Sequence, residues 1–397
     1  MDPLLLSIPF VTAIIGWGTN LLAIHMLFHP VNRVGGARLG WQGVLPSQAK
    51  RMAQMCVEMM TTQLIDARQV FERIDPDRVS ELLSPFLEEH AERIIEETLQ
   101  AQHPKLWQRM PEALRERARK RIQKQIPEIV EQVLGEVGED LENYLDLEGL
   151  VVEAFTKNRQ LVNDLFWECG SAEFQFIARS GFFFGGLFGC VQAVVWSFVQ
   201  PTWFLPATGL LVGWATNWLA LKMVFEPRYP KGFGPLSWHG LFHRRQPEVS
   251  QAYARFFSER ILTSENLINA VLTGPAAEKL VEQIRVYTEE AVDQAAGLAK
   301  PLLRMTVGGK EWSSLKEQIG FQLLAVLPGA IIETQAYADE AMDLHDNLAT
   351  SLEALPPEQF EGVLRPIFQE DETTLIAVGA ALGFVAGILQ LLIVTTL

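Results

Sequence analysis

Three stretches of the chain contain no aspartate, glutamate, lysine or arginine, and they constrain the fold more than any other feature. They run from Pro3 to Pro30, over 180–221, and from Thr373 to Leu397, and the middle stretch is long enough for two helices. A bilayer core about 30 Å thick is crossed by roughly 20 apolar residues in a helix. We therefore expect four transmembrane helices, at 1–30, 179–200, 204–227 and 373–397.

The two long stretches between these segments carry the pattern of amphipathic helices. In segments such as VSELLSPFLEEHAERIIEETLQ, apolar residues recur three and four positions apart with charges between them. Prolines divide both stretches into several helices. The fold class that we expect is therefore an all-α integral membrane protein with two large helical soluble domains, at 31–178 and 228–372.

Every lysine and arginine lies in two long stretches, about 31–179 and 222–365, and this distribution indicates on which side of the membrane these stretches lie. Arg33, Arg179 and Lys222 lie close to span ends, so the positive-inside rule places both soluble domains in the cytoplasm. The formal net charge is −15, with 48 acidic residues against 33 lysines and arginines. Such an acidic surface argues against nucleic acid as a partner.

A long motif occurs twice in the chain. GWGTNLLAIHMLFHP at 16–30 is followed, 197 positions later, by GWATNWLALKMVFEP at 213–227. Trp41 and Gly43 correspond to Trp238 and Gly240 at the same offset. We therefore expect two repeats, at about 1–198 and 199–397. Because each repeat crosses the membrane twice, the two should be parallel.

Small and polar residues form one stripe on each first helix of a repeat. A stripe of this kind lets another backbone approach closely and lets an amide bond across the contact. The alternative is that the stripe, with one glutamine from each second helix, lines a polar pathway between the repeats. The residues of this seam or pathway are Gly16, Thr19, Asn20, Gly213, Thr216, Asn217, Gln192 and Gln390.

Each second helix carries three glycines spaced four residues apart. This spacing exposes a groove of bare backbone, which favours tight helix crossing within or between subunits. We expect these two ladders to carry packing and assembly. They consist of Gly181, Gly185, Gly189, Gly379, Gly383 and Gly387.

The remaining motif positions predict anchoring and packing. Lys222 and Glu226 stand four apart and can form an ion pair at the helix end. Trp17 and Trp214 lie far from the helix ends, so we expect them to pack against the other spans.

No pattern in the chain indicates catalysis, a cofactor or a metal. The sequence contains no HExxH, Walker A, GxSxG or CxxC motif, and the three cysteines have no metal-binding spacing. We therefore expect a protein that is not an enzyme, with no catalytic, cofactor-binding or metal-ligating residues.

The two GW-TN motifs, together with WECGSAEFQFIARSGFFFGGLFGCVQAVVW at 167–196, resemble the bacterial YheB/YjiN-like membrane proteins, a domain-of-unknown-function family. The resemblance implies a bacterial plasma (inner) membrane protein, and it implies no activity that can be assigned to particular residues.

Two functions are compatible with these features. The first is a non-enzymatic, oligomeric membrane scaffold or adaptor, whose cytoplasmic helical domains contact another copy or other proteins while membrane lipids surround its spans. The second is a transporter or channel for a small solute or lipid, with its pathway at the interface of the two repeats. A third interpretation, lipid handling by the helical domains, requires an apolar groove that a sequence does not reveal.

Overall fold

The computed structural model of the protein describes residues 3–36, 40–102, 104, 108, 111–198, 201–232, 238–297, 300–301, 305, 308–363 and 365–396. Within this part of the chain the structure is helical throughout and contains no strand, only two isolated antiparallel bridges. The expected all-helical fold is thereby confirmed. The chain divides into two compact units.

The first unit consists of Met1–Leu64, Val151–Phe256 and His345–Leu397. Its helices are α1 (Pro3–Phe28), α2 (Val44–Ser47), α3 (Ala49–Met59), the π-helix η1 (Met60–Leu64), α10 (Gln160–Trp196), α11 (Phe204–Phe225), α12 (Leu241–Arg244), α20 (Pro357–Phe360), the 3-10 helix η4 (Glu361–Val363) and α21 (Arg365–Thr396). Three further helices cross the division between the units: α9 (Leu147–Lys157), α13 (Gln246–Arg260) and α19 (Leu344–Ala354).

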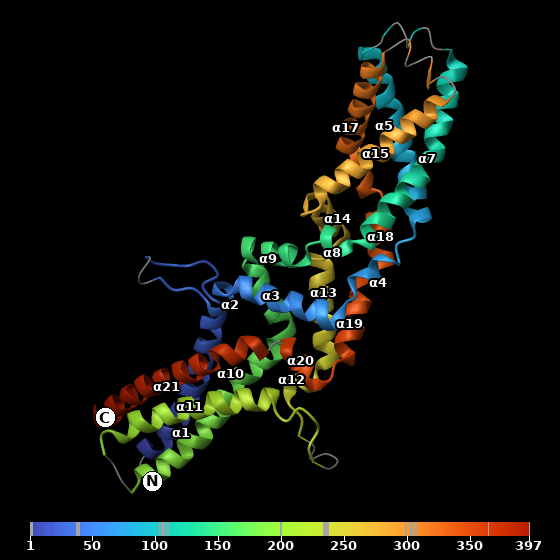
Figure 1. The fold of residues 1–397 in the computed structure, drawn as a ribbon. Helices are drawn as coiled ribbons and strands as arrows, with labels where there is room; N and C mark the ends of the chain where they lie inside the picture. The colour runs from blue at the N-terminus through green and yellow to red at the C-terminus, as the bar shows by residue number, and fades with distance from the viewer. Residues whose placement is uncertain are drawn as a thin grey trace. The chain divides into compact units, whose positions relative to one another are not determined.

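Four long helices, α1, α10, α11 and α21, lie side by side as a bundle in the first unit (Figure 1). α1 packs along α10, and α11 packs along α21. The two pairs then meet through contacts of α10 with α11 and of α1 with α21. Ile8, Ala193, Trp196 and Leu205 form a buried apolar cluster between the pairs. The bundle therefore consists of two helix pairs packed against each other.

Three of these helices are long and apolar enough to cross a membrane. They contain the segments Ser7–Phe28, Gln160–Trp196 and Phe204–Phe225. The expected fourth span lies in α21, whose apolar described part, Ile376–Leu392, is shorter. The segments Gly309–Ala330 and Gln335–Ala354 are apolar enough for a span only when they are taken together, and the chain bends by 63° between them. The structure therefore offers three to four candidate spans.

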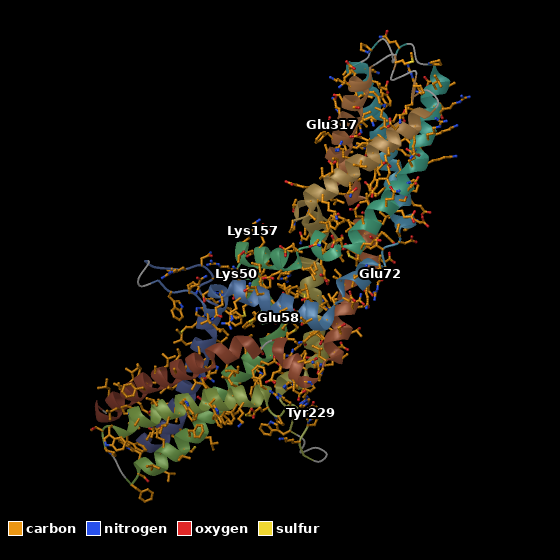
Figure 2. The ribbon with its side chains drawn as sticks, viewed as in Figure 1. Lys50, Glu58, Glu72, Lys157, Tyr229 and Glu317 are labelled. Carbon is orange, nitrogen blue, oxygen red and sulfur yellow. The ribbon has the colours of Figure 1, made fainter. Side chains whose placement is uncertain are left out.

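The outward faces of the bundle are apolar. On α10, Phe183 is 71% exposed and Leu187 is 60% exposed, although both are large hydrophobic residues. An apolar surface of this extent on adjacent helices is typical of a surface covered by lipid. The charged residues labelled in Figure 2, by contrast, all lie outside these four helices, and they are Lys50, Glu58, Glu72, Lys157 and Glu317. This distribution indicates a membrane location for the bundle.

Helix α10 is much longer than the expected span at 179–200. It begins at Gln160, so that 37 residues form one continuous helix. No proline interrupts the sequence between Gln160 and Trp196, and proline is the residue that most reliably ends a helix. The charged first half of α10 therefore extends the spanning helix beyond its apolar part.

The second unit consists of Ile65–Leu150 and Phe257–Leu344. Its helices are α4 (Ala67–Phe71), α5 (Pro76–Gln102), α7 (Glu112–Glu139), α8 (Leu141–Tyr144), α14 (Ser264–Thr273), α15 (Ala277–Ala296), α17 (Gly309–Ile332) and α18 (Gln335–Met342). The long helices α5, α7, α15 and α17 lie side by side in Figure 1.

This second unit differs from the expected division into separate domains at 31–178 and 228–372. α5 and α7 come from the first long stretch of the chain, and α15 and α17 come from the second. Ile94 and Leu99 of α5 share one buried cluster with Trp312, Leu315 and Ile319 of α17. The apolar face of each helix is therefore covered partly by helices from the other stretch, a pairing that helical periodicity alone does not specify.

Candidate functional site in the bundle

The first glycine ladder lies against α1 of the same chain. Gly16 of α1 meets the Gly181 carbonyl group directly, so that a Cβ on either glycine would overlap the backbone of the other. A Cβ added at Gly185 would lie 2.7 Å from the Thr12 carbonyl oxygen, and one at Gly189 would lie 2.7 Å from the Pro9 Cα. Only glycine permits such an approach, which is the close contact that small residues provide in membranes.

The second ladder lies against α11 in the same manner. Gly213 meets the carbonyl group of Gly379, and a Cβ at Gly383 would lie 3.2 Å from the Cα of Gly213. A Cβ added at Gly387 would lie 2.7 Å from the Pro206 Cα. Both ladders therefore face a helix of their own chain, and the described contacts use them for packing within one molecule.

The two asparagines lie in these seams. Asn20 is 1% exposed, and its Nδ2 donates a hydrogen bond of 2.7 Å to the carbonyl oxygen of Ile177 on α10. Asn217 is 4% exposed, and its amide lies against Gly379 on α21. Each amide thus bridges the two helices of its pair, as the packing interpretation of the motif requires.

The two threonines of the motif bond to their own helices. Thr19 Oγ1 donates to the Gly16 carbonyl oxygen at 3.1 Å, and Thr216 Oγ1 donates to the Gly213 carbonyl oxygen at 3.3 Å. A hydroxyl that donates its hydrogen bond to a carbonyl oxygen of the preceding turn has a partner within its own helix. These side chains therefore need no solute to complete their hydrogen bonding.

The glutamines lie where the two helix pairs meet. Gln192 Oε1 accepts a hydrogen bond of 3.2 Å from Thr12 Oγ1, and Gln192 Nε2 donates one of 2.8 Å to Thr208 Oγ1. Gln390 is 5% exposed, and its Nε2 has no hydrogen-bond partner among the residues that the structure describes. The difference follows from the sequence, because Thr208, which accepts from Gln192 Nε2, corresponds at the offset of 197 to Val11, and valine has no hydroxyl.

A small cavity separates the pairs at this level. Its volume is about 10 Å³, close to the minimum that holds one water molecule. Its lining includes Gln192 and Gln390 together with Gly16, Thr19 and Gly213. The structure therefore brings five of the eight predicted seam residues to one small polar void, while Asn20, Thr216 and Asn217 stay in the tight contacts of their own pairs.

The segments that follow the two motifs have matching hydrogen bonds. The Gly43 amide donates to the Pro30 carbonyl oxygen at 2.9 Å, and the Gly240 amide donates to the Pro227 carbonyl oxygen at 3.0 Å. The Trp41 indole nitrogen donates to the His29 carbonyl oxygen at 3.4 Å. The corresponding bond in the second half joins Trp238 Nε1 to the Glu226 carbonyl oxygen at 3.3 Å.

Other expectations for the motif had mixed outcomes. Lys222 and Glu226 form the expected ion pair, with Nζ and Oε2 3.5 Å apart, so this prediction is confirmed. The prediction that Trp17 and Trp214 pack against other spans is wrong, because they are 44% and 45% exposed. Each follows directly after a seam glycine, and one residue along a helix turns the side chain about 100° away from the contact face.

Sequence reasoning missed a buried ionic contact between α10 and the residue that follows α12. Glu173 on α10 is 1% exposed, and its carboxylate accepts hydrogen bonds of 2.6 and 2.8 Å from Arg245 Nη1. Arg245 also donates to Glu248 at 2.7 Å. The only sequence signal was an acidic residue in the segment CGSAEFQFIA at 169–178, which holds no other charge. A buried carboxylate requires a cationic partner, but the sequence does not show that this partner is Arg245, which lies 72 positions away.

The buried cysteines have ordinary structural surroundings. Burial raises the pKa of the Cys56 thiol to about 12, although a hydrogen bond with Tyr253 lowers it in part. A thiol with so high a pKa is a poor nucleophile at neutral pH. Among the described residues, no three histidine, cysteine, aspartate or glutamate side chains are placed to hold a metal ion together.

Comparisons with known proteins agree with this picture. Residues 10–164 match the model of a family described as Protein of unknown function (DUF445). Over 104 residues the chain is 30% identical to a UPF0754 membrane protein of Synechococcus sp. (strain JA-2-3B'a(2-13)). That match covers 25% of this chain and 24% of the relative, so the chain spans about a quarter of the relative's length. No solved structure matches the chain. The resemblance to an uncharacterised membrane protein family is therefore confirmed, with residues 10–164 carrying the match to DUF445.

Proposed function

We propose that the protein is a non-enzymatic membrane scaffold made of two parallel repeats, each contributing one helix pair to the bundle. The observation that carries this proposal is the direct backbone contact within both helix pairs, α1 with α10 and α11 with α21. Gly16 against Gly181, and Gly213 against Gly379, bring backbones into direct contact. A bundle packed at this distance is suited to hold extramembrane helices in place.

The matching hydrogen bonds support the repeat part of the proposal. In both halves, the amide of Gly43 or Gly240 and the indole of Trp41 or Trp238 bond to the chain just after the first spanning helix. The same local structure then follows from the same residues at an offset of 197 positions. Two copies of one unit account for this agreement.

The extramembrane helices are the contact surface in this proposal. On this proposal the protein lies in the bacterial inner membrane, and these helices lie in the cytoplasm and contact a second copy or another protein. Because the glycine ladders are occupied within one chain, association between copies uses other surfaces. The acidic balance of the chain favours partners with basic surfaces.

Two measurements on the full chain test the scaffold. Light scattering of the purified protein in mild detergent should give a protein mass of at least twice the 44.6 kDa of one chain. A photo-crosslinking residue at Glu317, exposed on α17, should capture protein in cells, whereas the same residue at Leu211, on the apolar outer face, should capture none. A monomer with no crosslink at Glu317 contradicts the proposal.

A second candidate is a channel or transporter for a small neutral solute. The unpartnered Nε2 of Gln390 beside a void of water size favours it, because a buried amide without a partner attracts a polar guest. Flux of water or glycerol into proteoliposomes that hold the protein, lost on Gln390→Leu, supports this candidate. Flux equal to that of empty liposomes rejects it.

A further inference from the structure

The side-chain amide of Gln390 on α21 is a buried hydrogen-bond donor. The side chain is 5% exposed, and within the described part of the chain its Nε2 atom meets no acceptor. A donor in this position has given up its hydrogen bonds to water and gained none from the protein. The amide therefore attracts a molecule that can accept a hydrogen bond.

The void beside this amide sets the size of that molecule. Gln390 lines the void of about 10 Å³ that separates the two helix pairs. A cavity needs at least about 10 to 15 Å³ to hold one water molecule, and it needs polar walls, because apolar cavities stay dry. Thr19 and Gln192 line the same void and supply further polar groups. In size and polarity the void therefore suits a single water molecule.

The amide oxygen of Gln192 is one acceptor in the lining, and it has capacity to spare. It lies 3.2 Å from Thr12 Oγ1, but this hydroxyl also lies 2.8 Å from the carbonyl oxygen of Ile8. A hydroxyl has one proton, so the nearer acceptor takes the larger share of it. An amide oxygen can accept two hydrogen bonds, and Gln192 Oε1 therefore has room for a second donor.

The hydroxyl oxygen of Thr19 is the other side-chain acceptor. Its proton is directed to the Gly16 carbonyl oxygen at 3.1 Å. A hydroxyl that donates its proton can still accept hydrogen bonds through its oxygen. One donor and two acceptors thus line one void, on helices α21, α10 and α1.

We propose that this void binds one water molecule as a permanent part of the bundle. The water accepts a hydrogen bond from Gln390 Nε2 and donates one each to Gln192 Oε1 and Thr19 Oγ1. Three hydrogen bonds are the usual number for a buried water. The water joins α21 to α10 and α1, and so links the two helix pairs.

The two glutamines then reach the opposite helix pair in different ways. Gln192 Nε2 of the first pair donates directly to Thr208 Oγ1 of α11, at 2.8 Å. Gln390 Nε2 of the second pair reaches α1 and α10 through the water. This site follows from the packing of the bundle and does not depend on the scaffold function, which the crosslinking at Glu317 tests separately.

The direct test is a density map of the full chain in lipid nanodiscs, at a resolution that shows ordered waters on the extramembrane helices. We expect a peak within hydrogen-bonding distance of both Gln390 Nε2 and Gln192 Oε1. A map that shows waters elsewhere in the protein but none in this void overturns the proposal.

The sign of a stability change is an independent test. Gln390→Met keeps a side chain of similar length and removes the amide. If the void holds water, the variant loses the hydrogen bonds of that water and melts at a lower temperature than the wild type. If the void is dry, the variant removes an unpartnered donor and melts at a higher temperature. A melting temperature equal to or above that of the wild type overturns the proposal.

The neighbouring residue supplies the matched control. Leu389 is 56% exposed on the outer face of α21, so Leu389→Met should leave the melting temperature unchanged in the same detergent. A map of Gln390→Met should lack the peak in the void. A peak that persists in this variant shows that other groups hold the water, and it overturns the role assigned to Gln390.

Discussion

Asn20 on α1 holds the carbonyl oxygen of Ile177 on α10 at 2.7 Å, across a contact so close that Gly16 and Gly181 have no room for a side chain. The amide forms a hydrogen bond between two spanning helices, in a place where no water competes for either group. It joins residues 157 positions apart and so ties the beginning of the chain to the start of its second span.

Asn20→Ala should therefore destabilise the bundle. Hydrogen bonds between membrane helices contribute about 0.6 kcal/mol on average and up to about 1.7 kcal/mol. We expect a loss near the upper value, because Asn20 is almost fully buried. The measurement is thermal unfolding in mild detergent. Leu21→Ala is the matched control, since Leu21 is the next residue but is 47% exposed on the outer face. An equal loss in both variants contradicts the assigned role of the amide.

Much of this seam was predictable from the sequence, because its determinants are local. Glycines and an asparagine at helical spacing define a face, and the face is what the structure buries. The partner of each face was not predictable. Gly16 contacts Gly181 because α1 pairs with α10, and no residue near Gly16 in the sequence indicates this pairing.

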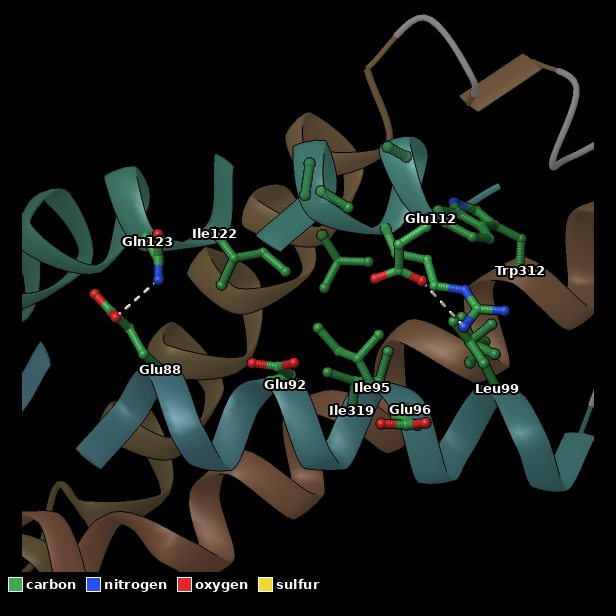
Figure 3. Close-up of a pocket in the computed structure, with 16 residues that line it drawn as sticks. Glu88, Glu92, Ile95, Glu96, Leu99, Glu112, Ile122, Gln123, Trp312 and Ile319 are labelled. Atoms are coloured by element: carbon green, nitrogen blue, oxygen red, sulfur yellow. Dashed lines mark hydrogen bonds and ion pairs between the residues drawn. The ribbon is translucent and has the colours of Figure 1, made fainter. Parts of the chain in front are cut away.

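The second unit shows the same limit in larger form. Each of α5, α7, α15 and α17 has the expected amphipathic pattern, yet the pattern does not say that Ile94 and Trp312 share a cluster. The expected boundaries followed the spans, whereas the packing joined segments from both sides of them. The cavity of about 320 Å³ in this unit (Figure 3) was equally hidden, because its lining residues come from α5, α7, α15 and α17 together.

Neighbouring glycines on α10 allow a sharp test of the ladder. A Cβ at Gly185 lies 2.7 Å from the Thr12 carbonyl oxygen, whereas one at Gly186 lies 3.5 Å from the Cβ of Ala13, an ordinary contact. Gly185→Ala should cost about 1 to 3 kcal/mol through overpacking. Gly186→Ala should be neutral or stabilise by up to about 1 kcal/mol through helix propensity. Melting temperatures of the two proteins in the same detergent decide, and similar values refute the close contact.

The Glu173–Arg245 contact predicts a recoverable loss of stability. Arg245→Met leaves the Glu173 carboxylate buried without its cation, which typically costs about 3 to 5 kcal/mol. Adding Glu173→Gln removes the uncompensated charge and should restore more than half of that loss. Arg244→Met, at an exposed neighbour, should change little. Unfolding in denaturant measures all four proteins. A double variant as unstable as Arg245→Met argues that packing of the arginine stem, rather than charge, holds this site.

Asp293 in the second unit predicts how stability depends on pH. Its burial alone would raise the pKa of the carboxyl, but hydrogen bonds from Lys300, Trp312 and Lys316 outweigh burial and hold the pKa below its ordinary 3.8. Trp312 Nε1 donates to Oδ1 at 2.9 Å, and Lys316 Nζ donates to Oδ2 at 3.1 Å.

A lowered pKa in the folded state means that the unfolded chain binds the proton more readily. The contribution of Asp293 to stability is therefore complete above pH about 4 and is lost as the pH falls through the folded pKa. Asp293→Asn should be less stable than the wild type by about 1 to 3 kcal/mol at pH 7, since charged hydrogen bonds have this worth. The difference should shrink below pH 4. Glu317→Gln, exposed on the same helix as Trp312, should show no such difference at either pH. Denaturant unfolding followed by circular dichroism at pH 7 and pH 3 provides the measurement, and a deficit of Asp293→Asn that stays constant between these values contradicts the assigned ionic role.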